Sequence, residues 1–119
     1  MKIDNYNGIK SFLEDNLAGK EVSMMVGGYI DPIREYRGKF EGVAYWNKES
    51  LEEKNIGEDF NGGIKLRVGD IEINLEAGSR RESDKLDLIS FEHDKQTIYY
   101  LASEDDRENG TGIFFKKIE

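Results

Sequence analysis

The chain has 119 residues, of which 37% are hydrophobic and 35% are charged, and it contains no cysteine. This length suits a single domain over residues 1–119 with a core of its own, and the lack of cysteine excludes disulfides and thiolate metal sites. The net charge of −8 is spread evenly, since residues 1–60 hold 8 basic and 12 acidic residues and residues 61–119 hold 9 basic and 13 acidic residues. A negative surface disfavours direct binding to nucleic acid or to an anionic membrane.

No stretch of the sequence approaches the ~20 apolar residues that a membrane-spanning helix needs. The first five residues, Met-Lys-Ile-Asp-Asn, lack the apolar run of a secretory signal. We therefore expect a cytoplasmic protein that does not act on membranes.

The first predicted element is a helix over about residues 7–18. Its apolar residues recur at the spacing i, i+3, i+4 and i+8, which makes one stripe on a helix. The stripe consists of Ile9, Phe12, Leu13 and Leu17. Gly19 follows as a C-terminal stop. Lys10, Glu14 and Asp15 lie off the stripe, and we expect them to face water.

From Lys20 the apolar period changes to two, which predicts strands. Seven strands are expected, over about residues 20–26, 34–46, 63–68, 71–76, 86–92, 96–102 and 113–118. In the second strand the alternation places four residues on one face, namely Tyr36, Phe40, Ala44 and Trp46. Gly38 and Gly42 share that face and mark a bend or the close approach of another backbone.

Gly69-Asp70 predicts a two-residue hairpin turn between two alternating runs. The turn sets a register in which the apolar residues of both runs lie on one buried face. These residues are Ile64, Leu66, Val68, Ile71, Ile73 and Leu75. The short connection at residues 93–95 predicts a second hairpin.

The expected fold is α+β, with an N-terminal helix packed on a strongly bent, mostly antiparallel sheet of about seven strands. Such a sheet could close into a small barrel, since closure removes exposed edges. Over Lys20–Trp46, the long strand with Gly38 and Gly42 resembles the bent strand of Sm-like and SH3-like barrels.

The sequence offers no catalytic set. Cysteine is absent, and the one histidine, His93, stands in a charged turn where a solvated side chain is expected. The acidic loop around Asp105 fails the calcium-loop pattern because Arg107 and Lys116 fall at ligand positions, and no glycine-rich loop carries a phosphate-binding signature. We therefore expect a protein that is not an enzyme and that uses no metal or cofactor.

Two dense acidic stretches connect strands, where binding groups tend to lie. The first is Glu49, Glu52, Glu53, Glu58 and Asp59, and the second is Glu104, Asp105, Asp106 and Glu108. They lead to the hypothesis of a non-catalytic acidic protein that binds a basic protein partner and antagonises nucleic-acid handling. Its size and acidity are similar to those of anti-CRISPR, anti-restriction and immunity-type inhibitors of phages and bacteria.

The alternative hypothesis is a small barrel that binds or sequesters an anionic metabolite or nucleotide. An arginine pair in a serine-flanked loop could grip a phosphate or carboxylate in a bidentate manner, and aromatic side chains at turn edges or on the polar face could stack on the ligand. The residues of this hypothesis are Arg80, Arg81, Tyr29, Tyr45 and Phe60.

Overall fold

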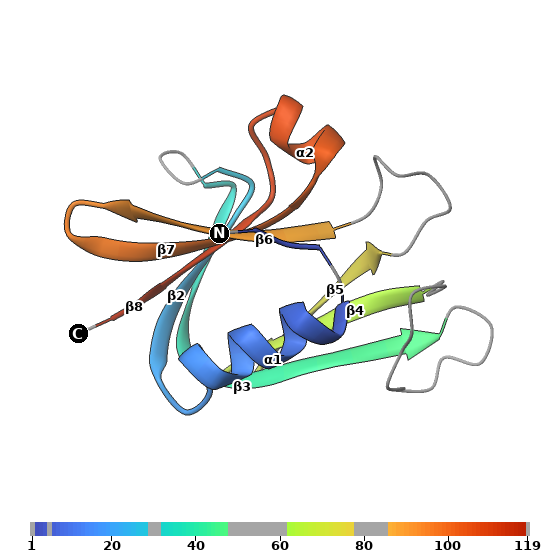
Figure 1. The fold of residues 1–119 in the computed structure, drawn as a ribbon. Coiled ribbons are helices and arrows are strands. Elements are labelled where there is room, and N and C mark those ends of the chain that lie inside the picture. The colour runs from blue at the N-terminus through green and yellow to red at the C-terminus, as the bar shows by residue number, and fades with distance from the viewer. Residues whose placement is uncertain (1, 5, 29–31, 48–61, 78–85, 119) are drawn as a thin grey trace.

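The computed structural model of the chain describes residues 2–4, 6–28, 32–47, 62–77 and 86–118, and these ranges contain two helices and eight strands (Figure 1). In chain order they are β1 (Lys2–Ile3), α1 (Tyr6–Leu17), β2 (Glu21–Val26), β3 (Arg34–Asn47), β4 (Gly62–Val68), β5 (Ile71–Ala77), β6 (Leu86–His93), β7 (Gln96–Ser103), α2 (Glu104–Glu108) and β8 (Ile113–Lys117). The predicted helix and the seven predicted strands are all present, each with ends within one residue of the prediction, whereas β1 and α2 were not predicted. No helix within these ranges is long and apolar enough to cross a membrane.

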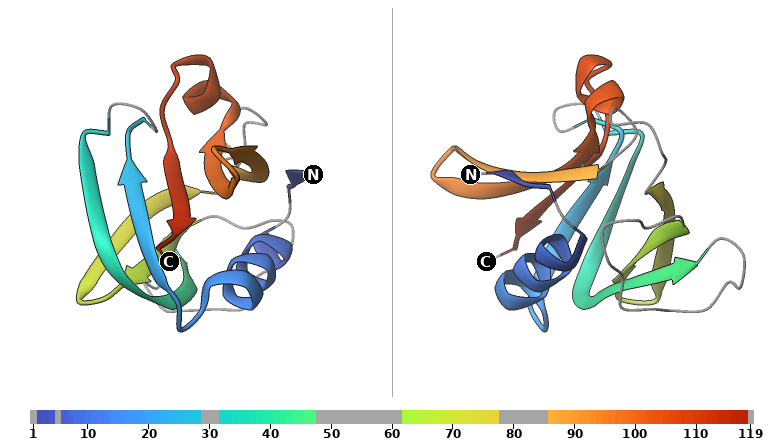
Figure 2. Two further views of the ribbon diagram at one scale, coloured as in Figure 1. Left: turned by 90° about the vertical axis from the view of Figure 1, so that its left-hand side faces the viewer. Right: turned by 45° about the vertical axis from the view of Figure 1, so that its right-hand side comes forward.

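The strands form one antiparallel sheet in the order β1-β6-β7-β8-β2-β3-β4-β5. This confirms the α+β class with an antiparallel sheet. The expectation of a closed barrel is wrong, because the terminal strands β1 and β5 do not pair with each other. The helix α1 lies beside β3 and β6 and covers the inner face of the curled sheet, so this face is buried by a helix instead of by closure (Figures 1 and 2).

The long strand β3 joins the two parts of the sheet. Its first half, Arg34 to Lys39, pairs with β2, and its second half, from Phe40 onward, pairs with β4. The register shifts between Phe40 and Gly42, where Gly42 has φ +148°. The predicted bend is therefore confirmed and takes the form of a β-bulge.

Gly38 confirms the predicted close approach of another backbone. A Cβ atom on Gly38 would lie 3.3 Å from the Cα and N atoms of Gly69 in the β4–β5 turn. The extra residue at the bulge, in turn, reverses the faces of β3 beyond it. Val43 and Tyr45 join Phe40 in the main core, so the prediction that Ala44 lies on the Phe40 face is wrong.

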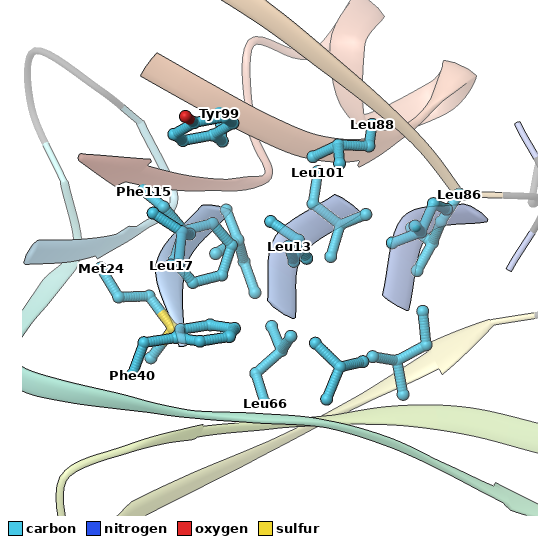
Figure 3. Packing of buried hydrophobic residues seen from close by; sticks show 14 of the residues in the cluster. Leu13, Leu17, Met24, Phe40, Leu66, Leu86, Leu88, Tyr99, Leu101 and Phe115 are labelled. Carbon is cyan, nitrogen blue, oxygen red and sulfur yellow. The ribbon is translucent and has the colours of Figure 1, made fainter. Parts of the chain in front are cut away.

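The main core lies between the two parts of the sheet and the stripe of α1 (Figure 3). Ile9, Leu13 and Leu17 of α1 are fully buried, and Phe12 is half-buried against the same core. Most of the core side chains come from α1 and six strands: Ile9, Leu13, Leu17, Val22, Met24, Phe40, Val43, Tyr45, Ile64, Leu66, Val68, Leu88, Leu101, Ile113 and Phe115. Helix and sheet therefore share one core, as the apolar stripe predicted.

The Gly69-Asp70 hairpin has the predicted register, with Val68 opposite Ile71. The prediction that all six apolar residues are buried is only partly correct. Those of β4 are fully buried, but Ile71 is 40% exposed and its β5 neighbours Ile73 and Leu75 are half-buried. The reason is that β5 is an edge strand, which among the described strands has a neighbour on one side only.

The second predicted hairpin is also confirmed. His93 lies opposite Gln96, and the two residues between them, Asp94 and Lys95, both have positive φ angles of 50° and 66°. This is the pattern of a type I′ turn, whose twist matches that of the flanking strands.

Candidate functional site

The second acidic stretch does not form the loop that was expected but the short helix α2, which lies on the opposite side of the molecule from α1 (Figures 1 and 2). Ser103 is its N-cap: the Ser103 hydroxyl accepts a hydrogen bond from the Asp106 backbone N–H at 3.1 Å. Asp106 Oδ2 accepts one from the Ser103 N–H, also at 3.1 Å. This capping box satisfies two N–H groups at the start of the helix, and acidic residues in a first turn are stabilised by the helix dipole.

Arg107 anchors α2 to the sheet. Its Nη2 atom lies 2.8 Å from Asp87 Oδ2 on β6, and its Nη1 atom donates to the Ala102 carbonyl on β7 at 3.3 Å. Lys2 Nζ of β1 lies 3.5 Å from the same Asp87 oxygen. Because Asp87 is only 9% exposed, this carboxylate joins three elements within a half-buried ion-pair network.

The segment from α2 to β8 is also held in place. The Thr111 N–H donates to the Asp106 carbonyl at 2.8 Å, and the Tyr100 hydroxyl donates to the Thr111 carbonyl. The Tyr100 ring stacks on Phe114 with centroids 4.2 Å apart. Burial raises the pKa of the Tyr100 phenol above its usual value.

The structure thus brings the four predicted acidic residues of the second cluster together on one fixed turn of helix. Glu104, Asp105 and Glu108 are exposed, and Asp106 is half-buried because it serves the cap. None of the three exposed carboxylates forms an ion pair with another described residue. With Arg107 engaged by Asp87, the outer surface of α2 carries negative charge that no basic side chain in the described part of the chain pairs with.

The first acidic cluster lies outside the described residues. Glu49, Glu52, Glu53, Glu58 and Asp59 therefore stay predictions. The same holds for Tyr29, Phe60, Arg80 and Arg81 of the alternative ligand site.

The predicted placement of Tyr45 on the polar face is wrong. Its side chain is 1% exposed, and its ring meets that of Tyr6 edge-on with centroids 6.2 Å apart. The bulge at Gly42 turns Tyr45 inward, and burial raises the pKa of its phenol well above the usual value. Tyr45 is therefore a core residue. Its predicted role in ligand binding stays a prediction, and its buried ring does not support that role.

A polar cluster beside the bulge was not predicted. Lys10 and Glu14 of α1 are half-buried and form an ion pair at 3.1 Å, so the expectation that both face water is wrong. Lys10 Nζ donates to the Val43 carbonyl, and the Val43 N–H donates to Glu14 Oε2 at 3.3 Å. A Cβ atom on Gly42 would lie 3.1 Å from that oxygen. The i,i+4 spacing of Lys10 and Glu14 was the visible signal, but only the bulge gives the pair its backbone partners.

No group of three or more histidine, aspartate or glutamate side chains among the described residues is arranged to hold a metal ion. His93 is half-exposed in its turn, with Nε2 3.3 Å from Asp94. Comparison of the chain with family models, with curated proteins and with solved structures finds no match. The candidate site is therefore the carboxylate surface of α2, which we define as Glu104, Asp105 and Glu108.

Proposed function

We propose that this protein is a non-catalytic inhibitor that binds a basic, nucleic-acid-handling protein through surface carboxylates, as anti-CRISPR, anti-restriction and immunity-type proteins do. The observation that carries the proposal is the set Glu104, Asp105 and Glu108, which is exposed and has no ion pair with the described residues, on a helix that is held at both ends. Such a protein would meet its partner in the cytoplasm.

Rigid attachment supports this proposal. A cleft that binds phosphates presents Arg and Lys side chains, and carboxylates can occupy the phosphate positions if they are held in fixed places. The Asp87–Arg107 ion pair and the Ser103–Asp106 capping box hold α2 without using its three outer carboxylates. Little backbone freedom is then lost on binding, which lowers the cost of association.

The test uses displacement of a fluorescent DNA duplex from a panel of purified basic nucleases and DNA-binding proteins, followed by anisotropy at low salt. We expect the wild-type protein to displace DNA from a cognate partner. Neutralising Glu104, Asp105 and Glu108 together (to Gln, Asn and Gln) should slow association at least several-fold, because charges at an interface rim chiefly set the association rate. The effect should shrink as salt is raised.

A matched control removes three exposed carboxylates elsewhere, with Asp4→Asn, Asp15→Asn and Glu21→Gln. Both variants change the net charge from −8 to −5. If the two variants lose association equally, the effect belongs to net charge and the role of α2 is refuted. Unchanged association in the α2 variant would refute it as well.

A further inference from the structure

The dipeptide Asn-Gly recurs along the chain, as Asn7-Gly8, Asn61-Gly62 and Asn109-Gly110. Asparagine is a chemically labile residue, because the backbone nitrogen of the next residue can attack its side-chain amide carbon. A following glycine hinders this attack least, since it has no side chain. The fold decides which copy reacts. Asn61 lies outside the described residues, so the comparison is between Asn109 and Asn7.

Asn109 lies at the exposed C-terminal end of α2 (Figure 1). It is the C-cap of this helix, and Gly110 follows it with φ +70°. Gly110 is exposed as well, and a Cβ atom on it would have no heavy atom within 4 Å apart from its chain neighbours. The attacking nitrogen and the amide group therefore lie where water reaches them.

Three hydrogen bonds hold the two reacting groups in place while α2 is folded. The Gly110 N–H donates to the Arg107 carbonyl at 3.2 Å. The backbone N–H and the Nδ2 atom of Asn109 both donate to the Asp105 carbonyl, at 3.2 and 3.0 Å. The side chain thus folds back along the helix, and the backbone of Asn109 is helical. Both groups must leave these partners before they can react, so the reaction requires α2 to open first.

Opening is easier for α2 than for α1. The helix α2 has five residues, none of them buried, and it is anchored to β6 through Arg107. The helix α1 has 12 residues, and Asn7 lies there between Tyr6 and Ile9, which are 6% and 0% exposed. Segments with few buried contacts open locally, whereas core elements open only when the whole protein unfolds. The fold therefore protects Asn7 far more than Asn109.

We propose that Asn109 is a site of spontaneous deamidation and that the anchoring of α2 sets its rate. In the open form the Gly110 nitrogen gives its proton to the solvent and attacks Cγ of Asn109. The bond from Cγ to Nδ2 breaks, and ammonia leaves with a proton taken from water. Water then opens the resulting succinimide ring at one of its two carbonyls, which leaves aspartate or isoaspartate. Water is the only co-reactant.

The product changes the C-terminal end of α2. It adds one negative charge, so the net charge goes from −8 to −9. A carboxylate cannot donate a hydrogen bond to the Asp105 carbonyl, and the helix dipole disfavours negative charge at this end. Isoaspartate also adds a methylene group to the backbone. Deamidation therefore destabilises the last turn of α2, and the inference stands without the proposed function.

The test incubates the full chain at mildly alkaline pH and follows the mass gain of each Asn-Gly copy. Tryptic peptide mapping separates the three copies, because lysine or arginine residues lie between them. The rate in guanidinium chloride divided by the rate in native buffer gives the protection of each copy by the fold. We expect Asn7 to be protected at least about ten-fold more than Asn109. Equal protection of the two, or no mass gain at Asn109 in the native protein, would overturn the proposal.

Variants test the role of the anchor. Arg107→Met should raise the native rate at Asn109 about ten-fold, because a charge-assisted hydrogen bond contributes at least that factor to the opening equilibrium. Lys20→Met, the same change at an exposed position, should leave the rate unchanged. Asn109→Gln should remove the mass gain from this peptide, because glutamine would have to close a larger ring.

Two measurements on Arg107→Met keep its result interpretable. Continued protection of Asn7 reports that the rest of the fold is intact, and the rate in guanidinium chloride reports that the chemistry at Asn109 is unaltered. A native rate at Asn109 equal to that of the wild type would then overturn the proposal. No binding partner enters these measurements, so their failure would leave the proposed function of the α2 carboxylates unaffected.

Discussion

The Asp87–Arg107 ion pair allows the sharpest test of how α2 is held. Arg107→Met keeps most of the aliphatic stem and removes the guanidinium. The side chains of Asp87 and Arg107 are 12% and 27% exposed, so their 2.8 Å hydrogen bond is largely shielded from water. Losing a charge-assisted bond of this kind costs about 1.5–3 kcal/mol. Lys2, 58% exposed and 3.5 Å from Asp87, replaces little of it.

For a chain of this length 1 kcal/mol corresponds to about 4 °C in Tm, so Arg107→Met should lower the Tm by roughly 6–12 °C. Lys20→Met, at an exposed position, is the matched control and should change it by about 2 °C or less. Thermal unfolding followed by circular dichroism measures both. In a double-mutant cycle with Asp87→Asn the coupling should reach about 1 kcal/mol. A loss below 1–2 °C, or a coupling near zero, would show that the pair does not hold α2.

Three further changes follow from the packing and the charges. Phe12→Ala should lower the free energy of unfolding in urea by about 2–3 kcal/mol, which is less than the 3–5 kcal/mol of a fully buried ring because Phe12 is half-buried. An unchanged free energy of unfolding would contradict the docking of α1. Gly112→Ala should lower the free energy of unfolding by at least ~2 kcal/mol, since Gly112 has φ +142° and a Cβ there would lie 2.5 Å from Tyr100 Cε1. A urea midpoint equal to that of the wild type would refute this. The hydrogen bond from Ser23 at 2.7 Å is the main cause of the lowered pKa of Glu35, so this carboxylate favours folding above its usual pKa and loses that effect as pH falls through the lowered value. Ser23→Ala should raise the Glu35 pKa in an NMR titration, and an unchanged pKa would contradict the assignment.

Local periodicity was enough to find α1 and the seven longer strands, because each buries one face and shows it as an apolar pattern. The faces of β3 beyond Gly42 were predicted wrongly. A bulge inserts one extra residue and so reverses the alternation of faces, and its only sign in the sequence is a glycine. Burial on β5 was overestimated because the alternation of Ile71, Ile73 and Leu75 tells which face they occupy, and the position of the strand in the sheet decides how well that face is covered.

For the candidate site, the sequence located the acidic residues of α2 but not their helix. The signal was present, since Ser103 and Asp106 have the spacing of a capping box and three acidic residues fill the first turn. A five-residue helix has no apolar stripe, so periodicity could not find it. Arg107 could not be assigned either, because its partner Asp87 is 20 residues away and only the sheet brings the two together.

The place of β8 in the sheet bears on how the chain folds. This strand is the last of the described elements in sequence, yet it lies between β7 and β2 and pairs with both, with Lys117 opposite Val22. During synthesis the β2–β5 and β6–β8 units can form from neighbouring residues, but β8 must then pair with β2 across a separation of 87 residues (Val26 and Ile113) to 95 residues (Val22 and Lys117). Such long-range pairing slows folding and leaves strand edges unpaired until it is complete. Weakening β8 should therefore slow refolding more than an equal loss of stability within the β4–β5 hairpin.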